Sequence, residues 1–447
     1  MKVIIIGCTH AGTAAVKRIY AQHPDTEVTI YEKNDNVSFL SCGIALFLSK
    51  RINDPQGLFY ASPQSLAKLG ADVKLQHEVL DVDPHMHTVT VKNLSDNHVF
   101  TDHYDKLIIT TGSWPIIPPI DGIHDSHVFL CKNWEHAQTL WQKAQNAQRI
   151  TIIGGGYIGV ELAEAFAVTK HQVTLIDGMP RILSKYLDAN FTDRIEDNFR
   201  KHGVTLALNQ FVQSFTSDDN GVTITTTKGK YHSDLAILCV GFRPNTTLFK
   251  DKLAMHPNGA LVTNEYMQTS DPDIYAAGDA VAIHYNPTNQ AAYIPLATNA
   301  VRQGIIAGSN IFKNTMKDMG TQSTSGLKLF DEVIVSSGMT LEAAQAAQIP
   351  AQAVTISDNY RPEFMPTTPV LMRLVYNTTN RQILGAQLMS KYDVSQSANT
   401  ISVMIQNHNT IDDLAMVDML FQPYFDRPFN YLNLLGQAAV QQAEQNK

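Results

Sequence analysis

Two stretches of the chain, about 150 residues apart, share one pattern of apolar and polar positions. Each begins with a short apolar run, passes through a glycine-containing turn into an amphipathic segment, and ends with a second apolar run and an acidic residue. The first copy spans residues 2–32 and the second spans residues 149–177. A strand, a glycine turn, a helix and a second strand in this order are typical of a nucleotide-binding α/β unit. The repeat therefore predicts two such units and two nucleotides.

The segments around the second copy predict how the chain passes between the two units. Residues 79–99 alternate between apolar and polar positions, which predicts β-strands beside the first unit. Residues 105–112 form a further buried strand, and the prolines that follow it mark a linker into the second unit. A strand at 235–240 precedes the expected return near 241–244. The stretch to about residue 320 then belongs to the first unit and ends in a helix around 299–312.

From about residue 326 the pattern changes. Strands at 370–376 and 383–389 are followed by helices at 394–406 and 411–420, and this part of the sequence has no glycine-rich nucleotide turn. We therefore predict a third domain of the α+β class. The expected bounds are 1–115 and 244–322 for the first nucleotide domain, 116–243 for the second, and 323–447 for the third.

Composition and charge favour a globular protein that acts on small molecules. The 447 residues are 44% hydrophobic and 17% charged, which is enough apolar material for several cores. A formal net charge of -8 and a pI of about 6.0 provide no basic footprint for nucleic acid or for an anionic membrane surface. We therefore expect neither as a partner.

The apolar runs and the cysteines bear on location. No apolar run reaches the roughly 18 residues of a membrane span, and the run after Met1 is too short for a signal-peptide core. We expect a cytoplasmic protein. Its four cysteines (Cys8, Cys42, Cys131 and Cys239) are widely spaced without a CxxC pair, so neither a disulfide framework nor a metal site is predicted.

The turn of the second copy has the full glycine pattern of a dinucleotide site. Gly154 permits the tight turn, Gly156 removes a side chain that would block pyrophosphate, and Gly159 lets helix and strand pack closely. Asp177, at the end of the next strand, can accept hydrogen bonds from the adenine ribose and would repel a 2′-phosphate, which favours NADH over NADPH. A solvated strand-end carboxylate is the alternative for Asp177, and the nearby Arg181 leaves some NADPH use open.

The turn of the first copy departs from that pattern. Gly7 and Gly12 are present, but Thr9 occupies the place of the middle glycine. Glu32 stands where the ribose-binding acid is expected, at the end of the next strand. Because the other site takes NADH, FAD is the natural second dinucleotide.

Cys42 and His10 are the candidate reactive residues. A lone cysteine beside apolar residues is usually an inert buried thiol. A helix that begins near Cys42 would instead lower its pKa and favour a nucleophilic thiolate. His10 lies in the turn that would face the flavin, where it could stabilise the thiolate or transfer protons, or simply solvate a loop.

Taken together, four motifs resemble those of the NADH peroxidase and water-forming NADH oxidase family, within the pyridine nucleotide-disulfide oxidoreductases. The resemblance covers nearly the whole chain. The motifs are Thr9-His10-Ala11-Gly12, Ser38-Phe39-Leu40-Ser41-Cys42-Gly43, Ala276-Ala277-Gly278-Asp279 and the run from Phe421 to Asn433.

The resemblance implies an α/β fold with two Rossmann-like dinucleotide-binding domains, for FAD and NADH, plus a C-terminal α+β dimerisation domain. It implies a homodimer in which the region of Tyr424 and Phe425 reaches the active site of the partner. The implied catalytic residues are Cys42, cycling between thiol and sulfenic acid, and His10. The residues implied for FAD are Gly7, Thr9, His10, Ala11, Gly12, Glu32, Cys42, Val79, Thr110, Thr111, Gly112, Ser113, Lys132, Asp279, Leu296, Ala297, Thr298, Tyr424 and Phe425. Those implied for NADH are Gly154, Gly156, Tyr157, Ile158, Gly159, Asp177, Tyr186 and Gly241.

The favoured activity is a water-forming NADH oxidase that uses two NADH for each O2. Residues 43–47 hold no second cysteine, so a single thiolate would be oxidised by peroxide to sulfenic acid rather than forming a disulfide. An NADH peroxidase that starts from H2O2 and a coenzyme A-disulfide reductase are the alternatives, because both also use one cysteine. A flavoprotein sensor with little turnover is a further alternative, for which the sequence has no additional interaction module.

Overall fold

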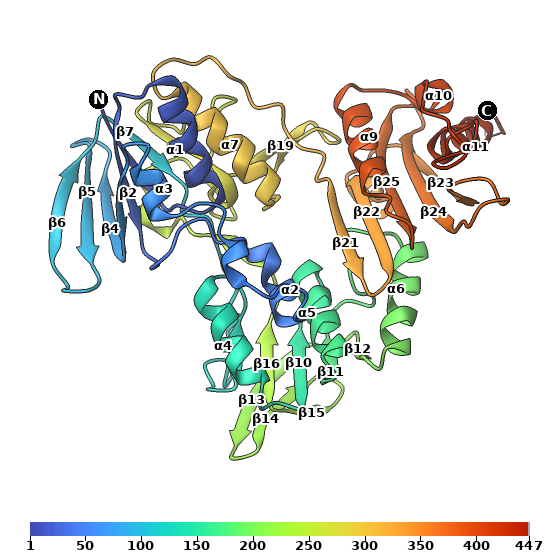
Figure 1. Ribbon diagram of the computed structural model, residues 1–447, viewed down its shortest axis with the longest axis horizontal. Coiled ribbons are helices and arrows are strands. Elements are labelled where there is room, and N and C mark those ends of the chain that lie inside the picture. The colour runs from blue at the N-terminus through green and yellow to red at the C-terminus, as the bar shows by residue number, and fades with distance from the viewer. Residues whose placement is uncertain (446–447) are drawn as a thin grey trace.

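The chain forms three connected parts in the computed structural model, which describes residues 1–445. Figure 1 shows the N-terminal segments, in blue, packed together with the yellow segments of the second half of the chain. The green part lies below them, and the orange and red C-terminal part lies to the right.

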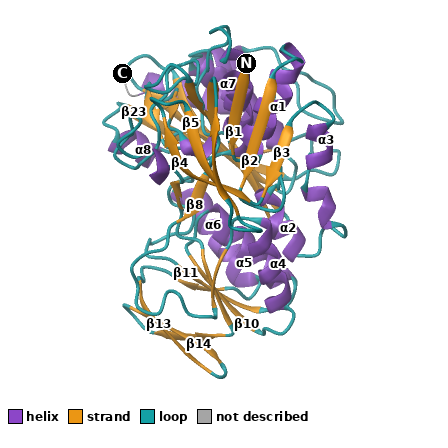
Figure 2. Ribbon diagram, turned by 90° about the vertical axis from the view of Figure 1, so that its left-hand side faces the viewer, coloured by secondary structure: helices purple, strands orange, loops and turns teal. Residues whose placement is uncertain are grey.

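The first part is built on a five-stranded sheet in which every neighbouring pair is parallel. The strands in spatial order are β18 (Ile274–Ala276), β7 (Lys106–Ile109), β1 (Lys2–Ile6), β2 (Glu27–Glu32) and β3 (Asp72–Leu75). Helices cover the sheet, which is why β1 and β7 are almost continuously apolar. The view in Figure 2 shows α1 and α3 beside this sheet. The helices of this part are α1 (His10–Gln22), α2 (Ile44–Leu48), α3 (Pro63–Ala67) and α7 (Ala297–Asn310).

Two small antiparallel sheets belong to the same part. One contains β4 (His77–Asp83), β5 (Thr88–Asn93) and β6 (Val99–His103), where alternating residues predicted strands. The other pairs β19 (Ile283–Tyr285) with β20 (Gln290–Ala292). The predicted helix around 299–312 is present as α7, which packs on α1.

The second part repeats the arrangement. Its parallel sheet has the order β12 (Thr205–Ala207), β11 (Gln172–Ile176), β10 (Arg149–Ile153), β16 (Leu235–Leu238) and β9 (Val128–Leu130). Its helices are α4 (Trp134–Ala144), α5 (Tyr157–Val168) and α6 (Ala189–Lys201). An antiparallel sheet of β13 (Val212–Asp218), β14 (Gly221–Thr226) and β15 (Lys230–Ser233) lies at the lower edge in Figure 1.

The two passages between these parts lie side by side. The outgoing segment is β8 (Ser113–Pro115) and the returning segment is β17 (Phe242–Pro244), and they pair antiparallel with Trp114 opposite Arg243. The two connections therefore form one short ribbon next to both nucleotide turns.

The third part is an antiparallel sheet with helices. Its strand order is β21 (Ser325–Leu329), β22 (Glu332–Gly338), β25 (Ile383–Ser390), β24 (Pro369–Asn377) and β23 (Ala351–Asn359). Its helices are α8 (Leu341–Ala346), α9 (Ser395–Gln406), α10 (Ile411–Met416) and α11 (Tyr431–Gln445). The prediction of a helix over 411–420 was too long. The chain leaves the helix at Val417, whose carbonyl and that of Leu414 accept hydrogen bonds from Asn433 Nδ2, both at 3.0 Å.

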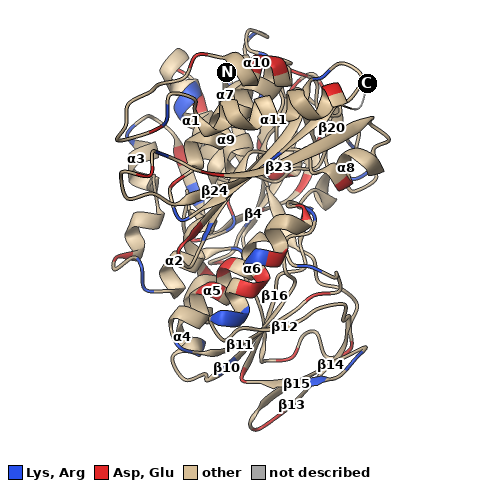
Figure 3. Ribbon diagram, turned by 90° about the vertical axis from the view of Figure 1, so that its right-hand side faces the viewer, with Lys and Arg blue, Asp and Glu red and all other residues tan. Residues whose placement is uncertain are grey.

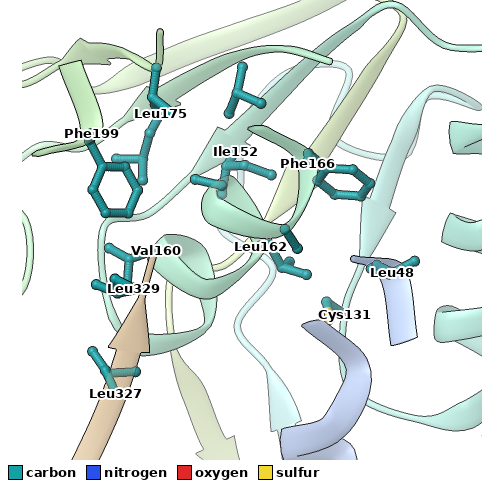
Figure 4. Close-up of a cluster of buried hydrophobic side chains, with 14 of the residues drawn as sticks. Leu48, Cys131, Ile152, Val160, Leu162, Phe166, Leu175, Phe199, Leu327 and Leu329 are labelled. Atoms are coloured by element: carbon teal, nitrogen blue, oxygen red, sulfur yellow. The ribbon is translucent and has the colours of Figure 1, made fainter. Parts of the chain in front are cut away.

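The third part is joined to the second by both apolar and charged contacts. Leu327 and Leu329 of β21 belong to the same buried cluster as Val160 and Phe199, and Figure 4 shows these side chains together. Arg373 Nε of β24 donates to Asp188 Oδ2, which precedes α6, at 2.9 Å. A buried pair that loses one partner costs several kcal/mol. This contact therefore fixes the third part against the second.

Charged residues of both signs are interspersed along the ribbon in the view of Figure 3.

No helix among residues 1–445 is long and apolar enough to cross a membrane. Nor does that part of the chain contain a group of three or more His, Cys, Asp or Glu side chains that could hold a metal ion.

Candidate active site

The carboxyl ends of β1 and β10 open onto one cleft with a volume of about 1480 Å³. A pocket for one small ligand is typically about 300–1,000 Å³, so this cleft is large enough for more than one such ligand. Both glycine turns line it, as do residues of the connecting ribbon. Ligands of open α/β sheets bind at such carboxyl ends.

Glycine is required in the first turn because a side chain would not fit there. Gly7 has a φ of +89°, and a Cβ there would lie 2.6 Å from the Thr110 carbonyl oxygen. A Cβ on Gly12 would lie 2.3 Å from the Gly7 carbonyl oxygen. The helix α1 follows without a side-chain cap, so its first N–H groups are free to bind pyrophosphate.

Glu32 is buried at the end of β2 and lines the cleft. Its Oε2 accepts a hydrogen bond from the Cys8 N–H at 2.7 Å, and its Oε1 accepts from the Asn34 N–H at 2.9 Å. Burial raises the pKa of this carboxyl, while the hydrogen bonds from Asn34 and Cys8 act in the opposite direction. The glycine turn and the acid are thus held together before any ribose binds.

The second turn has the same construction. Gly154 has a φ of +108°, and a Cβ on Gly159 would lie 1.8 Å from the Gly154 carbonyl oxygen. Gly156 has no atom within 4 Å of its Cβ position and lines the cleft, so its lack of a side chain leaves room for a ligand. Asp177 accepts hydrogen bonds from the Gly155 N–H and, at 2.6 Å, from the Met179 N–H.

A polar cluster forms the floor of the cleft beside the first turn. Ser113 Oγ donates to Asp279 Oδ2 at 2.7 Å, and Lys132 Nζ donates to Ser113 Oγ at 3.0 Å. Lys132 Nζ also lies 3.5 Å from Asp279 Oδ2 and 4.5 Å from the centre of the Phe242 ring. Thr111 Oγ1 is buried without a partner among the described residues, which identifies a polar group that a ligand can satisfy.

Cys42 lies in the 3-10 turn Ser41–Gly43 and is exposed to the cleft. The expectation that a helix lowers its pKa was wrong. The following helix α2 has only five residues, and the walls of the cleft and the Glu161 carboxylate raise the pKa of Cys42, with Lys132 acting in the opposite direction. The groups of this chain alone therefore favour the thiol over the thiolate.

His10 is the first residue of α1 and also lines the cleft. Its Nδ1 lies 2.9 Å from the hydroxyl oxygen of Tyr60, and its Nε2 is buried without a partner among the described residues. Burial lowers the pKa of His10, against the opposing effect of the Asp279 carboxylate. His10 is therefore neutral at neutral pH.

Glu161 on α5 is a residue that the sequence motifs did not indicate. Burial and the neighbouring Glu164 raise its pKa to about 7. It lines the cleft with Tyr157 and Ile158, which lie four and three residues earlier on the same helix face. Helical spacing from the glycine turn could have identified it.

An aromatic pair stands over the second turn. The rings of Tyr157 and Tyr186 lie 4.1 Å apart, and the Tyr157 hydroxyl lies 2.7 Å from Ser325 Oγ, at the start of β21. Burial raises the pKa of Tyr157 to about 12, so its hydroxyl stays protonated. The third part of the chain thus reaches the nucleotide cleft through Ser325.

Most of the sequence-predicted site residues meet in this one cleft, and five do not line it. Gly12 and Gly159 lie beneath the turns, where they allow close packing, and Thr298 lies one residue beyond the cleft-lining Ala297. Tyr424 and Phe425 are absent from the wall of this cleft and are 63% and 60% exposed.

We expect Glu161→Gln to speed alkylation of Cys42 about fivefold at mildly alkaline pH. The substitution removes a negative charge that opposes the thiolate, and an interaction of about 1 kcal/mol changes the thiolate fraction by that factor. The effect is measured as the rate at which iodoacetamide labels Cys42 in the reduced protein. The difference should vanish well below pH 7, where Glu161 is protonated in the native protein. The exposed Glu363→Gln is the matched control, and equal rates in all three proteins would contradict the interpretation.

Sequence and structure comparisons agree on the type of protein that this chain resembles. The family model described as pyridine nucleotide-disulphide oxidoreductase matches residues 1–304, and the model of its dimerisation domain matches residues 324–431. A protein of Enterococcus faecalis named NADH oxidase is 54% identical over 444 residues, covering 99% of this chain and 100% of the relative.

Two solved structures superpose closely on the chain. The water-forming NADH oxidase from Lactobacillus brevis, bound to NADH, is 62% identical with a TM-score of 0.99, covering 100% of this chain and 99% of that one. An engineered water-forming NADPH oxidase made from it, bound to NADPH, has the same identity and TM-score and covers 100% of both chains.

Proposed function

This chain belongs to the pyridine nucleotide-disulphide oxidoreductase family, and from that premise we propose that it oxidises NADH with O2 and forms water. The observation that carries the proposal is one exposed thiol, Cys42, in a cleft that both dinucleotide turns line. All four cysteines are free, so the reaction rests on a single sulfur rather than on a disulfide. The similarity to NADH oxidases over the whole chain supports the same activity.

The residues of the first turn fit FAD. Gly7 and Gly12 let the turn pack closely, so that the uncapped start of α1 can receive pyrophosphate. Glu32 stands at the ribose position, and the unpartnered Thr111 Oγ1 and the cluster around Asp279 offer polar contacts. Bound there, FAD supplies a two-electron carrier between the nicotinamide and oxygen. Lys132 and Asp279 would hold it, and Tyr157 with Tyr186 would cover the nicotinamide end of the cleft.

Cys42 would remove the peroxide that oxygen reduction produces. Its sulfur forms a bond to one peroxide oxygen, the O–O bond breaks, and the other oxygen leaves as water with the thiol proton. The sulfur is oxidised by two electrons to sulfenic acid, and a second NADH with a proton returns it to the thiol and a second water. The sum is two NADH, two protons and one O2 giving two NAD⁺ and two water molecules.

The proposal is tested first by the bound flavin. The purified protein should absorb visible light as an oxidised flavoprotein, NADH should bleach it without oxygen, and oxygen should restore the colour. A protein that stays colourless when FAD is supplied, or whose flavin NADH does not reduce, would overturn the proposal.

Asp177 is expected to select NADH. Its carboxylate is held at the second turn by two backbone N–H groups and would repel a 2′-phosphate. We expect Asp177→Ala to raise kcat/KM for NADPH relative to NADH about tenfold, equivalent to about 1.4 kcal/mol. The engineered relative that binds NADPH includes an aspartate-to-alanine change. An unchanged ratio would show that Asp177 is a solvated carboxylate without a role in selection.

We also propose that the chain is a homodimer with the third part at its interface. Large apolar side chains are exposed around the segment before α11: Met416, Leu420, Phe421, Tyr424, Phe425 and Phe429. Such a patch is typical of an interface, and the dimerisation-domain model matches this part of the chain. Tyr424 and Phe425 then reach the FAD site of the partner, while Cys42 and His10 act within their own chain.

Analytical ultracentrifugation should give a dimer for the native protein and monomer for Leu420→Glu. The charge would be buried without a partner at the interface, which costs several kcal/mol. Met86→Glu, on the β4–β5 hairpin, is the matched control and should remain dimeric. A native protein that is monomeric at micromolar concentration would contradict the proposed dimer.

The need for NADH also leads us to propose a cytoplasmic location.

A further inference from the structure

Tyr60 lies against His10, although nothing in the sequence around it indicates a role. Its hydroxyl oxygen is 2.9 Å from His10 Nδ1, and the two rings are nearly parallel, 6° apart in plane with centres separated by 5.6 Å. Tyr60 is 43% exposed and belongs to none of the buried clusters of residues 1–445. Packing in the core therefore does not explain a tyrosine at this place.

The backbone holds Tyr60 in register with the segment that leads to Cys42. Ser38 Oγ donates to the Ala61 carbonyl oxygen at 2.7 Å and accepts from the Ala61 N–H at 2.8 Å. The Leu40 N–H donates to the Leu58 carbonyl at 2.8 Å. Ser38 has a φ of 59°, a backbone conformation that L residues adopt only when the surroundings require it. The backbone on both sides of Tyr60 is therefore joined to the segment that leads to Cys42.

The contact with Tyr60 determines which nitrogen of His10 carries the proton. Partial burial raises the pKa of the Tyr60 phenol, so the phenol stays protonated at neutral pH. A phenol O–H is a better donor than a neutral imidazole, whose free nitrogen is the better acceptor. The Tyr60 hydroxyl therefore donates to Nδ1, and the proton of neutral His10 lies on Nε2. That Nε2–H is buried and has no acceptor among the described residues.

We propose that Tyr60 is a positioning residue that holds His10 with its Nε2–H available to the oxygen that reacts at Cys42. His10 and Cys42 line the same cleft, and Asp279 and Lys132 act on the charge of both side chains. This inference rests on the proposed reduction of peroxide by the Cys42 thiol. As the O–O bond breaks, negative charge develops on the departing oxygen, and a preorganised N–H donor stabilises it until the thiol proton completes the water molecule.

Without the Tyr60 hydroxyl, His10 is no longer restricted to one tautomer. With the proton on Nδ1, the unprotonated Nε2 has no hydrogen to donate to the departing oxygen. Attack by Cys42 then slows, and more peroxide escapes from the cleft before it is reduced. The reduction of bound FAD by NADH does not involve this donor and should proceed as before.

The test compares Tyr60→Phe with the native holoenzyme. Losing one neutral hydrogen bond corresponds to about a three- to tenfold slower reduction of H2O2 at Cys42, so we expect Tyr60→Phe to release H2O2 that the native enzyme does not release. The FAD content and the rate of anaerobic flavin reduction should be unchanged. Tyr266→Phe, a tyrosine outside the cleft, is the matched control and should release no more peroxide than the native enzyme.

Two further variants separate positioning from a general loss of structure. In a His10→Ala background, Tyr60→Phe should add no further peroxide, because the residue that it orients is absent. Tyr60→Ala should release peroxide, and added phenol, but not toluene, should suppress that release. Additive effects of the two substitutions, or equal rescue by toluene, would overturn the inference.

The failure of this inference is distinct from the failure of the proposed function. If the native enzyme itself releases one H2O2 per NADH, the proposed function is wrong and the inference is overturned with it. If the native enzyme forms only water and Tyr60→Phe does the same, Tyr60 has no positioning role and the proposed function stands.

Discussion

Replacing Cys42 with serine is expected to turn the enzyme from a water-forming oxidase into one that releases H2O2. The native protein should use two NADH for each O2, and Cys42→Ser should use one and release one H2O2. A serine hydroxyl is a weak nucleophile at neutral pH and its oxygen cannot be oxidised reversibly, whereas sulfur forms sulfenic acid. The substitution leaves both glycine turns and the polar cluster around Asp279 unchanged. FAD should therefore still bind, NADH should still reduce it, and oxygen consumption should continue.

An oxygen electrode with a peroxide assay in the same vessel, in the absence of catalase, measures this outcome. Cys239→Ser makes the same change of atom at another residue of the cleft and should keep the ratio at two. If Cys42→Ser still forms only water, Cys42 does not reduce the peroxide, and another group must do so.

Placing valine at position 304 is expected to empty the flavin site. Gly304 of α7 faces α1, and a Cβ there would lie 2.2 Å from the carbonyl oxygen of Ala11. Backbone cannot move aside as a flexible side chain can, so α1 must shift, and the glycine turn before it shifts too. Overpacking of this kind costs about 3 kcal/mol.

The FAD content of the purified protein and its thermal unfolding temperature measure the effect of Gly304→Val. Both should fall sharply. Gly229→Val is the matched control, because nothing lies within 4 Å of its Cβ position, and it should keep its flavin. A Gly304→Val protein with a full complement of FAD and an unchanged unfolding temperature would show that the α1–α7 contact does not support the site.

The parts of this molecule that could be predicted are those where local sequence determines structure. The two glycine turns were recognisable because backbone conformation and lack of space permit little else at Gly7 and Gly154. Asp177 lies at the end of the strand that follows the second glycine turn. The pattern that predicts the turn therefore also predicts this acid.

The missed features arise from contacts between segments. Tyr60 lies beside His10 in a segment that hydrogen bonds between Ser38 and Ala61 help to hold, and no local pattern predicts that pairing. The sequence predicts that a helix lowers the pKa of Cys42, but burial in the cleft and the carboxylate of Glu161, on a distant segment of the chain, raise that pKa. The predicted helix over 411–420 was too long because Asn433, on α11, binds carbonyl groups at its end.

We propose that one cleft carries electrons from NADH to oxygen and that a single sulfur in it completes the reduction to water. The ratio of NADH oxidised to O2 consumed by the native holoenzyme, with peroxide assayed in the same vessel, tests this most directly. We expect two NADH for each O2 and no accumulating H2O2. One NADH for each O2, with an equal amount of H2O2, would contradict it.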